Sequence, residues 1–494
     1  MHAQDAELES ALRVSELARD RTLRDHFADQ EWRRTKVPEA ARSRLEAMAE
    51  GIQELDERIA VAPDVVERIR LESERTLAVS EKGRLERELR SSLDLGELDQ
   101  RPPTLDELRA HLADNTALVS VLHSGETWWA LVILHDAPAQ FVVFPDPDIG
   151  RNAAAWLGRL RGDPVRAWPM ERERLAVGPA RPAGATGAYL DTEELARRLE
   201  RSLMAPLRPA IGARRRLVFV GDEELVGVPL QALPLAQGLV VDRYAISYAP
   251  SLSTYARWQG TGQRGRHPRD LLAVGAIDYR PVATGSPDDP IAAGMQYAAE
   301  HPLPYAREEI AAISSLFPPA RTQVWTGAHA TKAALRLASH SGELRRYRFV
   351  HIAAHAWAQA GQPESAAIAL GGRDDDAPAQ HAMTAAELAG LRMNADLIVL
   401  SACDTGLGHF EHGQGLLGLA YAGLAAGNRA ALLSLWPIAD DTTALFMTRL
   451  YERMRSGADP VLALAETQRA FRQSRDPRLA DPIVWAPFVI YGGY

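Results

Sequence analysis

The sequence predicts an α/β protein: a parallel-rich sheet flanked by helices, preceded by an α-helical N-terminal segment. Two observations lead to this prediction. Continuous apolar runs alternate with helix-like stretches over the C-terminal half, which is typical of parallel strands buried on both faces. The first 100 residues hold 41 charged residues, against 80 in the remaining 394, and show a helical repeat instead.

A chain of 494 residues is too long for one core and should divide into two to four domains. We expect a helical hairpin or coiled-coil-like segment over 1–100 and two α/β halves over 101–255 and 256–494. The net charge of −9, without long runs of like charge, disfavours nucleic-acid binding. The single cysteine, the lack of a signal-peptide pattern and the short apolar runs predict a cytoplasmic protein without a membrane segment.

A heptad-like seam marks the N-terminal segment. Pro38 and Pro63 each stand where a helix could begin, because proline suits the first helical position. Between them, apolar residues recur at intervals of 4, 3, 4, 3 and 4 residues: Ala41, Leu45, Met48, Ile52, Leu55 and Ile59. Such a seam needs a partner, and a second helix from Asp64 to about Leu93 could supply it.

Residues 101–255 read as a first α/β half without an evident catalytic cluster. The tetrad T-L-D-E from Thr104 to Glu107 has the form of a capping box and predicts a short helix. The run A-L-V-S-V-L-H-S-G-E-T-W-W-A-L-V-I-L predicts two strands around a Ser-Gly turn. Helix-like stretches are expected near Glu193 to Leu207, and R-L-V-F-V-G-D-E-E-L-V-G-V-P predicts strand, turn and strand.

Residues 256–494 alternate strands and helices, as in a parallel sheet covered on both faces. The expected strands are 271–276, 347–354, 396–402 and 430–436. The expected helices are 306–317, 331–338, 415–426, 442–454 and one after Pro460.

Two residues at strand ends could carry chemistry. His355 follows Y-R-F-V-H-I-A-A, and Cys403, the only cysteine, follows D-L-I-V-L-S-A, 48 residues later. Ligands of open α/β sheets bind at the carboxyl ends of strands, so both side chains would face one cleft if these strands are neighbours. An imidazole raises the thiolate fraction of a thiol, and N–H groups of the D-T-G-L-G turn could hold an oxyanion. The pattern suits attack on a carbonyl, although a lone cysteine at a strand end is also typical of core packing.

Other candidates indicate structure rather than chemistry. His351 lies inside the same strand and is expected to pack in the core. G-Q-G-L-L-G at 413–418 does not come directly off a strand, which favours helix–sheet packing over a dinucleotide site. The residues around Cys403 do not form the G-x-C-x-G elbow, which argues against an α/β hydrolase or amidotransferase with a cysteine nucleophile. The 14 histidines are scattered and no H-E-x-x-H occurs, so no metal and no cofactor are expected.

Several blocks, in order, resemble the CHAT family of caspase-like cysteine peptidases, relatives of caspases, metacaspases and separases. They are L-V-F-V-G-D-E-E-L-V-G-V-P-L-Q-A-L, Y-A-I-S-Y-A-P-S-L-S, H-I-A-A-H-A, L-I-V-L-S-A-C-D-T-G, G-Q-G-L-L-G-L-A-Y-A-G-L-A-A-G-N-R-A-A-L-L-S-L-W-P-I-A-D and D-P-I-V-W-A-P-F-V-I-Y-G. The resemblance covers about 101–494 and implies a caspase-like fold with a non-catalytic half (101–255) and a catalytic CHAT half (256–494). It maps the family's dyad onto His355 and Cys403.

The resemblance also implies substrate contacts. In many caspase relatives the residue after the dyad histidine is glycine, whose N–H helps the amide of the cysteine to bind the oxyanion; here Ala356 retains that N–H. Asp440 follows S-L-W-P at another strand end, where separases use an acidic residue to select basic side chains, and Asp404 could contribute. Either aspartate could instead cap a helix.

Two hypotheses follow. The first is a cysteine endopeptidase that cleaves a partner protein after Arg or Lys, in bacterial defence or programmed cell death, as relatives fused to helical repeats do. The second is a catalytically silent caspase-like module that acts as a regulatory scaffold. In either case the N-terminal helices could dock a regulatory protein partner.

Overall fold

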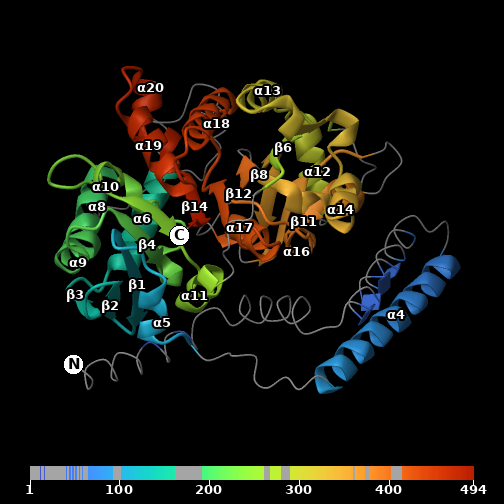
Figure 1. The fold of residues 1–494 in the computed structure, drawn as a ribbon, viewed down its shortest axis with the longest axis horizontal. Helices are drawn as coiled ribbons and strands as arrows, with labels where there is room; N and C mark the ends of the chain where they lie inside the picture. The colour runs from blue at the N-terminus through green and yellow to red at the C-terminus, as the bar shows by residue number, and fades with distance from the viewer. Residues whose placement is uncertain are drawn as a thin grey trace, which may run out of the picture.

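The computed structural model (Figure 1) describes most of the chain. The described residues are 65–92, 102–162, 192–260, 267–279, 290–359, 362–372, 378–401 and 414–493, with single residues between 12 and 58. They form a large sheet with helices on both faces and a smaller sheet beside it.

The large sheet has 11 strands. In chain order they are β1 (Thr116–Ser124), β2 (Thr127–Leu134), β3 (Gln140–Phe144), β4 (Arg216–Val220), β5 (Ala245–Tyr248), β6 (Arg269–Gly275), β7 (Thr322–Thr326), β8 (Tyr347–Ala353), β12 (Leu397–Ser401), β13 (Ala430–Ser434) and β14 (Phe488–Gly492). Their order across the sheet is β3-β2-β1-β4-β5-β14-β13-β12-β8-β6-β7. The pairs β1–β2, β2–β3 and β13–β14 are antiparallel and the other described pairs are parallel, which confirms the predicted fold class.

Helices lie on both sides of this sheet. Those of the first half are α5 (Leu105–Ala110), α6 (Ile149–Gly162), α8 (Thr192–Leu199), the π-helical turn η1 (Glu200–Met204), α9 (Ala205–Ile211), α10 (Val240–Arg243) and α11 (Leu252–Gly260). Those of the second half are α12 (Pro290–Glu300), α13 (Ala306–Ser315), α14 (Lys332–His340), α15 (Pro378–His381), α16 (Ala385–Ala389), α17 (Gln414–Ala425), α18 (Asp440–Arg455), α19 (Pro460–Arg472), α20 (Pro477–Ala480) and α21 (Pro482–Trp485). In Figure 1, α13 and α18 lie above β8 and β12, and α16 and α17 lie below them.

The central strands are apolar on both faces because successive residues point to opposite helix layers. On β12, Ile398 faces α17, where a Cβ added to Gly423 would lie 2.9 Å from its side chain. The neighbouring Leu397 pairs with Phe349 of β8, whose ring meets Tyr451 of α18 edge-on at 5.8 Å between centroids. Every residue of β12 is buried, and each buried Val, Leu or Ile side chain stabilises the fold by about 1.5–3 kcal/mol.

A smaller sheet follows β8 directly. It consists of β9 (Ala356–Gln359), β10 (Gln362–Ala369) and β11 (Ala382–Thr384), antiparallel and in the order β11-β10-β9. Met295 of α12 packs against Trp357 and Ala367 of this sheet. The small sheet thereby holds α12 beside the end of β8, an arrangement that the sequence patterns did not predict.

Helix α19 joins the two halves. Arg216 at the start of β4 forms two hydrogen bonds with Asp459, at 2.9 and 3.1 Å, and Asp459 also caps α19. At the other end of the helix, Arg472 donates to Asp242 at 2.9 Å. Strands β5 and β14 also pair directly. A domain boundary near residue 255 would therefore fall inside one continuous sheet.

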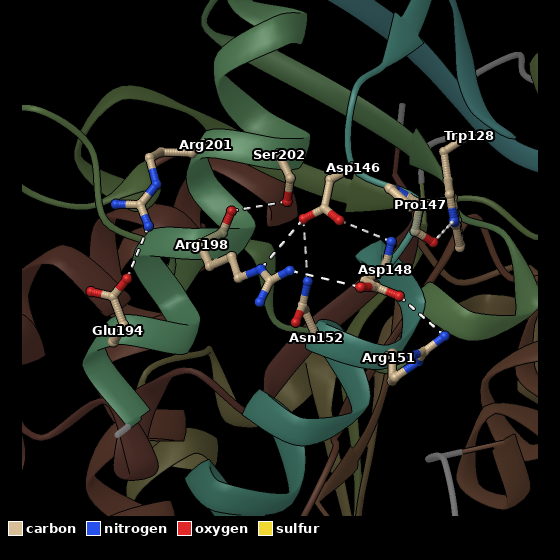
Figure 2. A network of polar contacts seen from close by, with 10 residues as sticks. All are labelled: Trp128, Asp146, Pro147, Asp148, Arg151, Asn152, Glu194, Arg198, Arg201 and Ser202. Carbon is tan, nitrogen blue, oxygen red and sulfur yellow. Dashed lines mark hydrogen bonds and ion pairs between the residues drawn. The ribbon is translucent and has the colours of Figure 1, made fainter. Parts of the chain in front are cut away.

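A polar network joins α6 to α8 in the first half (Figure 2). Asp146 accepts hydrogen bonds from the backbone N–H of Asp148 at 2.9 Å and from Asn152 Nδ2 at 3.3 Å. Arg198 of α8 lies 3.5 Å from the Asp146 carboxylate and 3.8 Å from that of Asp148. Because these carboxylates are engaged in turns and ion pairs, we interpret the network as structural.

One expectation for the first half was confirmed and another was wrong. The helix-like stretches expected near 193–207 are present as α8, η1 and α9, in a region where Pro206 and Pro209 lack the N–H that a regular α-helical turn needs. The strand expected directly after β4 and its turn does not form; the 3₁₀ turns η2 (Glu223–Leu225) and η3 (Leu230–Ala232) take its place. Asp222 caps η2 and Gly227 turns the chain with a φ of 75°.

The N-terminal segment is helical where the structure describes it. Helix α4 (Val65–Ser92) matches the second helix of the expected hairpin, and the described seam residues from Ala41 to Leu55 are helical, whereas Ile59 lies outside the described residues. Arg58 Nη2 lies 4.0 Å from Glu67 Oε1 across the expected turn. The packing of the hairpin stays a prediction. Among the described helices, none combines the length and apolarity needed to cross a membrane.

Two residues near the N-terminus contact the first half. Leu12 is buried in a cluster with Leu105 of α5. Glu16 is 2% exposed, and its carboxylate accepts hydrogen bonds from the backbone N–H groups of Leu252 at 3.2 Å and Ser253 at 2.8 Å. The carboxylate thereby caps the N-terminus of α11, where the helix dipole favours a negative charge.

Candidate active site

Four parallel strands end at one edge of the large sheet. β13, β12, β8 and β6 are neighbours in that order, so their carboxyl ends lie together. The residues that follow them in the chain are Asp440 after β13, Cys403 after β12, His355 after β8 and Tyr279 after β6. Cys403 and Asp404 lie outside the described residues. The other three can be described in full.

The two proposed dyad residues follow a pair of neighbouring residues on β8 and β12 by the same number of positions. Ala353 is the partner of Ser401, and the backbone N–H of Ala354 donates to Ser401 O at 3.3 Å. His355 comes two residues after Ala353, and Cys403 comes two residues after Ser401. The 48-residue interval between His355 and Cys403 thus equals the interval between two paired residues on adjacent strands, which lie about 4.8 Å apart.

His355 is buried, and several described residues contact it. Its Nε2 lies 2.5 Å from the backbone oxygen of His301. A carbonyl oxygen can only accept, so Nε2 carries the proton and Nδ1 is the basic nitrogen of the neutral ring. The backbone N–H of His355 donates to the Tyr279 hydroxyl at 3.0 Å, and Tyr297 lies edge-on to the imidazole with 5.9 Å between ring centroids. These contacts fix one tautomer and one orientation.

The carbonyl of His301 is presented by the C-terminal end of α12. The backbone N–H of His301 donates to Tyr297 O at 3.0 Å, and its Nδ1 lies 2.9 Å from the same oxygen. The rings of Tyr297 and His301 stack with 4.0 Å between their centroids, because residues four apart lie on the same side of a helix. The last turn of α12 is therefore anchored, and the His301 oxygen is held against His355.

Ala356 presents its backbone N–H away from the small sheet. Ala369 N donates to His355 O at 2.8 Å, so Ala356 and Ile368 form a pair of the non-hydrogen-bonded kind. In such a pair the N–H points away from the partner strand, and β9 is the edge strand of the described small sheet. Among the described residues, Ala276 is the one non-glycine residue with positive φ, so Ala356 needs no glycine-like backbone.

Asp440 lies at the start of α18 but does not cap that helix, whose cap residue is Ala439. Its Oδ2 instead accepts the backbone N–H of Tyr305, at the start of α13, at 2.6 Å. Burial, together with the nearby carboxylates of Glu309, Asp441 and Glu308, raises the pKa of Asp440 to about 6, and the hydrogen bond from Tyr305 opposes this shift. A positive charge beside these carboxylates would favour the ionised form of Asp440.

His351 packs in the core, as expected, with one feature that the strand pattern did not predict. It is fully buried, and its Nε2 lies 2.8 Å from Oε1 of Glu309, which is also buried. Tyr451 covers the imidazole at 5.6 Å between ring centroids. This pair lies between β8 and α13 rather than at the strand ends. In the described part of the chain, no three His, Cys, Asp or Glu side chains gather as a metal site.

Sequence reasoning missed Tyr279, Tyr297 and His301. Tyr279 comes four residues after β6 and His301 directly follows α12, and nothing in the spacing of the sequence links them to His355. The short i, i+4 pair of Tyr297 and His301 was the available signal, but its meaning depends on where α12 lies. Only the fold brings these three residues to the dyad histidine.

Comparisons with known proteins agree with this architecture. Residues 193–493, more than half of the chain, match the family model described as the CHAT domain. The chain is 26% identical over 331 residues to tetratricopeptide repeat protein 28 of Mus musculus and 25% identical over 326 residues to that of Homo sapiens. Each match covers 60% of this chain but only 13% and 12% of those relatives, so the chain spans a small part of their length.

Solved structures with a similar arrangement include the Saccharomyces cerevisiae separase–securin complex, at 10% identity and a TM-score of 0.46 over 78% of this chain and 30% of that one. The Arg-specific cysteine proteinase gingipain R has 10% identity and a TM-score of 0.33 over 61% of this chain and 66% of that one. The family match decides the assignment and confirms the resemblance seen in the sequence: the chain belongs to the CHAT family.

Proposed function

We propose that this chain is a cysteine endopeptidase in which Cys403 and His355 form the catalytic dyad. The observation that carries the proposal is the pairing of Ala353 with Ser401, because each proposed dyad residue follows one member of that pair by the same number of residues. The fixed tautomer of His355 supports the same role, since its basic nitrogen is Nδ1. Membership of the CHAT family agrees with a peptidase.

In the proposed reaction, the Cys403 thiol gives its proton to His355 Nδ1, and the thiolate attacks the scissile carbonyl carbon. The carbonyl oxygen becomes an oxyanion, bound by the backbone N–H groups of Ala356 and Cys403. Collapse of this intermediate breaks the C–N bond, and the leaving amine takes the proton from His355. Water then hydrolyses the thioester with His355 as the base, which regenerates the thiol. The His301 carbonyl stabilises the imidazolium formed in both steps.

We further propose that Asp440 selects Arg or Lys before the cleaved bond, with Asp404 as a second contact. Asp440 lies at the same edge of the sheet as His355. Burial raises the pKa of Tyr279, which touches His355, and the negative charge of Asp440 adds to this shift. A bound guanidinium or ammonium would offset the repulsion among the carboxylates around Asp440. A preference for Asp before the cleaved bond would contradict this assignment.

The single cysteine makes the dyad testable without a known substrate. Iodoacetamide can alkylate only Cys403, and intact-mass measurements against pH give the pKa of its thiol. We expect a pKa below the ordinary value of about 8.5, and a return toward that value in His355→Ala. An unchanged pKa in His355→Ala would refute the dyad.

Specificity requires a peptide library that covers every residue before the cleaved bond, assayed with wild type and Cys403→Ala. We expect cleavage after Arg and Lys by wild type and none by the variant. The library should be run with and without candidate partner proteins, because an inhibited form would show activity only with its partner. Cleavage that persists in Cys403→Ala would end the assignment.

The N-terminal segment favours a regulatory protein partner for this peptidase. Glu16 and Leu12 attach that segment to the first half. We propose that the partner binds there and controls cleavage of a protein substrate, in bacterial defence or programmed cell death. The alternative is a catalytically silent scaffold that uses the same surface. A thiol of ordinary pKa, with partner binding intact, would favour the scaffold.

A further inference from the structure

The segment after β6 takes an unusual path to His355. Ala276 has a φ of 49°, in the left-handed region that non-glycine residues rarely adopt. Its carbonyl accepts the backbone N–H of Gly327 at 3.1 Å, which holds the turn in place. Gly275 just before it approaches β8 so closely that a Cβ would lie 3.0 Å from Ala353. This turn directs the chain from β6 across the end of β8 and brings Tyr279 to His355.

Tyr279 contacts His355 in two independent ways. Its hydroxyl accepts the backbone N–H of His355 at 3.0 Å, and its ring lies against the imidazole with 5.1 Å between centroids at 51°. Burial and the charge of Asp440 raise the pKa of the phenol, so the hydroxyl stays neutral and keeps its own hydrogen. A neutral hydroxyl can accept the His355 N–H at every pH at which the protein is folded.

The hydrogen bond to the His355 backbone affects more than the imidazole. The next residue is Ala356, whose N–H we assign to the oxyanion, and the peptide group between the two residues forms the corner from β8 into β9. In the described structure, the His301 carbonyl and the Tyr297 ring contact the side chain of His355. The Tyr279 hydroxyl contacts the backbone N–H of His355, in the peptide group that directly precedes this corner.

We propose that Tyr279 is a positioning residue that, through its hydroxyl, fixes the His355–Ala356 corner and so sets the base and the oxyanion donor together. This inference rests on the proposed peptidase function. It differs from a packing role, because removal of the hydroxyl alone, with the ring retained, should alter the reactivity of the dyad.

Tyr279→Phe is the direct test, and Tyr451→Phe is its matched control. Tyr279 is partly buried and Tyr451 fully buried, and both lie against a histidine ring, but Tyr451 contacts His351 in the core. We expect Tyr279→Phe to lower kcat about tenfold, the equivalent of about 1.4 kcal/mol, with KM changed less than twofold. Tyr451→Phe should leave both constants within twofold of wild type.

The pH dependence of Cys403 alkylation separates positioning from packing. Tyr279→Phe should move the thiol pKa part of the way from the wild-type value toward that of His355→Ala, whereas Tyr451→Phe should not move it. Melting temperatures of all variants, measured at the same pH, verify folding.

The inference is overturned if Tyr279→Phe matches wild type in both kcat and thiol pKa while His355→Ala shifts the pKa. If His355→Ala leaves the thiol pKa unchanged, the proposed dyad itself fails, and the inference fails with it. The two failures are therefore distinguishable.

Discussion

Replacement of Asp440 by Asn tests whether this carboxylate serves substrate binding or structure. Asp440 accepts a hydrogen bond from the backbone N–H of Tyr305 at the start of α13. A purely structural cap would make the aspartate stabilising, because a negative charge at a helix N-terminus is favoured. Its raised pKa indicates the opposite: near neutral pH, ionisation of Asp440 costs folding free energy. The two interpretations predict opposite signs for the change in stability.

The magnitude follows from the pKa. The ordinary value is 3.8 and the folded value is about 6, and each pH unit corresponds to about 1.36 kcal/mol, which gives about 3 kcal/mol. Solvent access to the half-buried side chain reduces this to roughly 1 kcal/mol. The folded state binds the proton more tightly, so Asp440 contributes full stability below about pH 4. That contribution is lost as the pH rises through 6.

Asp440→Asn keeps an oxygen that can accept the Tyr305 N–H but carries no charge. We expect the variant to be more stable than wild type by roughly 1 kcal/mol at pH 7.5. A chain of 494 residues unfolds with an entropy of about 1 kcal/mol/K, so the gain in melting temperature is about 1 °C. At pH 4 the two proteins should melt alike. The same variant should lose at least tenfold in kcat/KM on substrates with Arg before the cleaved bond.

Scanning fluorimetry at pH 7.5 and pH 4, together with kinetics on paired Arg and Gln substrates, provides the assay. If Asp440→Asn melts below wild type at pH 7.5 and cleaves the Arg substrate normally, Asp440 is a cap and the proposed pocket is wrong. For wild type, kcat/KM on the Arg substrate should fall as the pH drops below about 6, since Asp440 is then protonated.

Three further predictions concern other parts of the molecule. Glu16→Gln should release the N-terminal segment, seen as faster limited proteolysis before residue 65 with an unchanged core, because the charged cap on α11 weakens; equal rates would contradict the contact. Gly492→Ala should destabilise the fold by more than 3 kcal/mol, since its Cβ would lie 2.3 Å from Arg429 O. Gly457 has a φ of 100° but open space around it, so Gly457→Ala should cost only about 1 kcal/mol. Urea titrations measure both changes in the free energy of unfolding. Ala356→Pro removes the proposed oxyanion donor and should lower kcat at least 100-fold, whereas Ala356→Gly, which retains the N–H, should keep most activity; equal losses would remove Ala356 from the oxyanion site.

The sequence predicted the parts of the fold that depend on burial. Strands β12 and β13 are nearly continuous apolar runs and β8 is mostly apolar because both faces of each strand are covered, and such runs are visible without any tertiary information. Helix α18 and the capping box at Thr104 were also predicted, since their signals are local. Strands β7, β9 and β10 were missed because half-exposed or mixed strands lack that pattern.

The candidate site was predictable only in part, for a related reason. Residues that follow a buried strand, such as His355, inherit their position from the strand, so the sequence located them. Tyr279 and His301 reach the site through a left-handed residue and a helix end, respectively. Asp440 was located at the correct edge, but its hydrogen bond to Tyr305 of another helix depends on how α13 packs against α18.

The charge on Asp440 and the hydroxyl of Tyr279 should act together. Burial raises the pKa of Tyr279 and the charge of Asp440 adds to this, so the two groups interact electrostatically, and Tyr279 contacts the backbone of His355. A cation bound at Asp440 would neutralise the negative charge of its carboxylate. The Tyr279 hydroxyl would then no longer experience that charge when His355 becomes protonated during the reaction. Substrate charge would then affect the base as well as the binding pocket.

A double-mutant cycle measures this coupling. The free-energy loss of each variant is calculated from its kcat/KM on an Arg substrate. If the two residues act independently, the losses of Asp440→Asn and Tyr279→Phe add. We expect the double variant to fall short of that sum by about 0.5–1 kcal/mol, because the charge of Asp440, which acts on Tyr279, is already absent in Asp440→Asn. On a Gln substrate the coupling should vanish. Strict additivity on both substrates would mean that specificity and positioning are separate properties of this edge of the sheet.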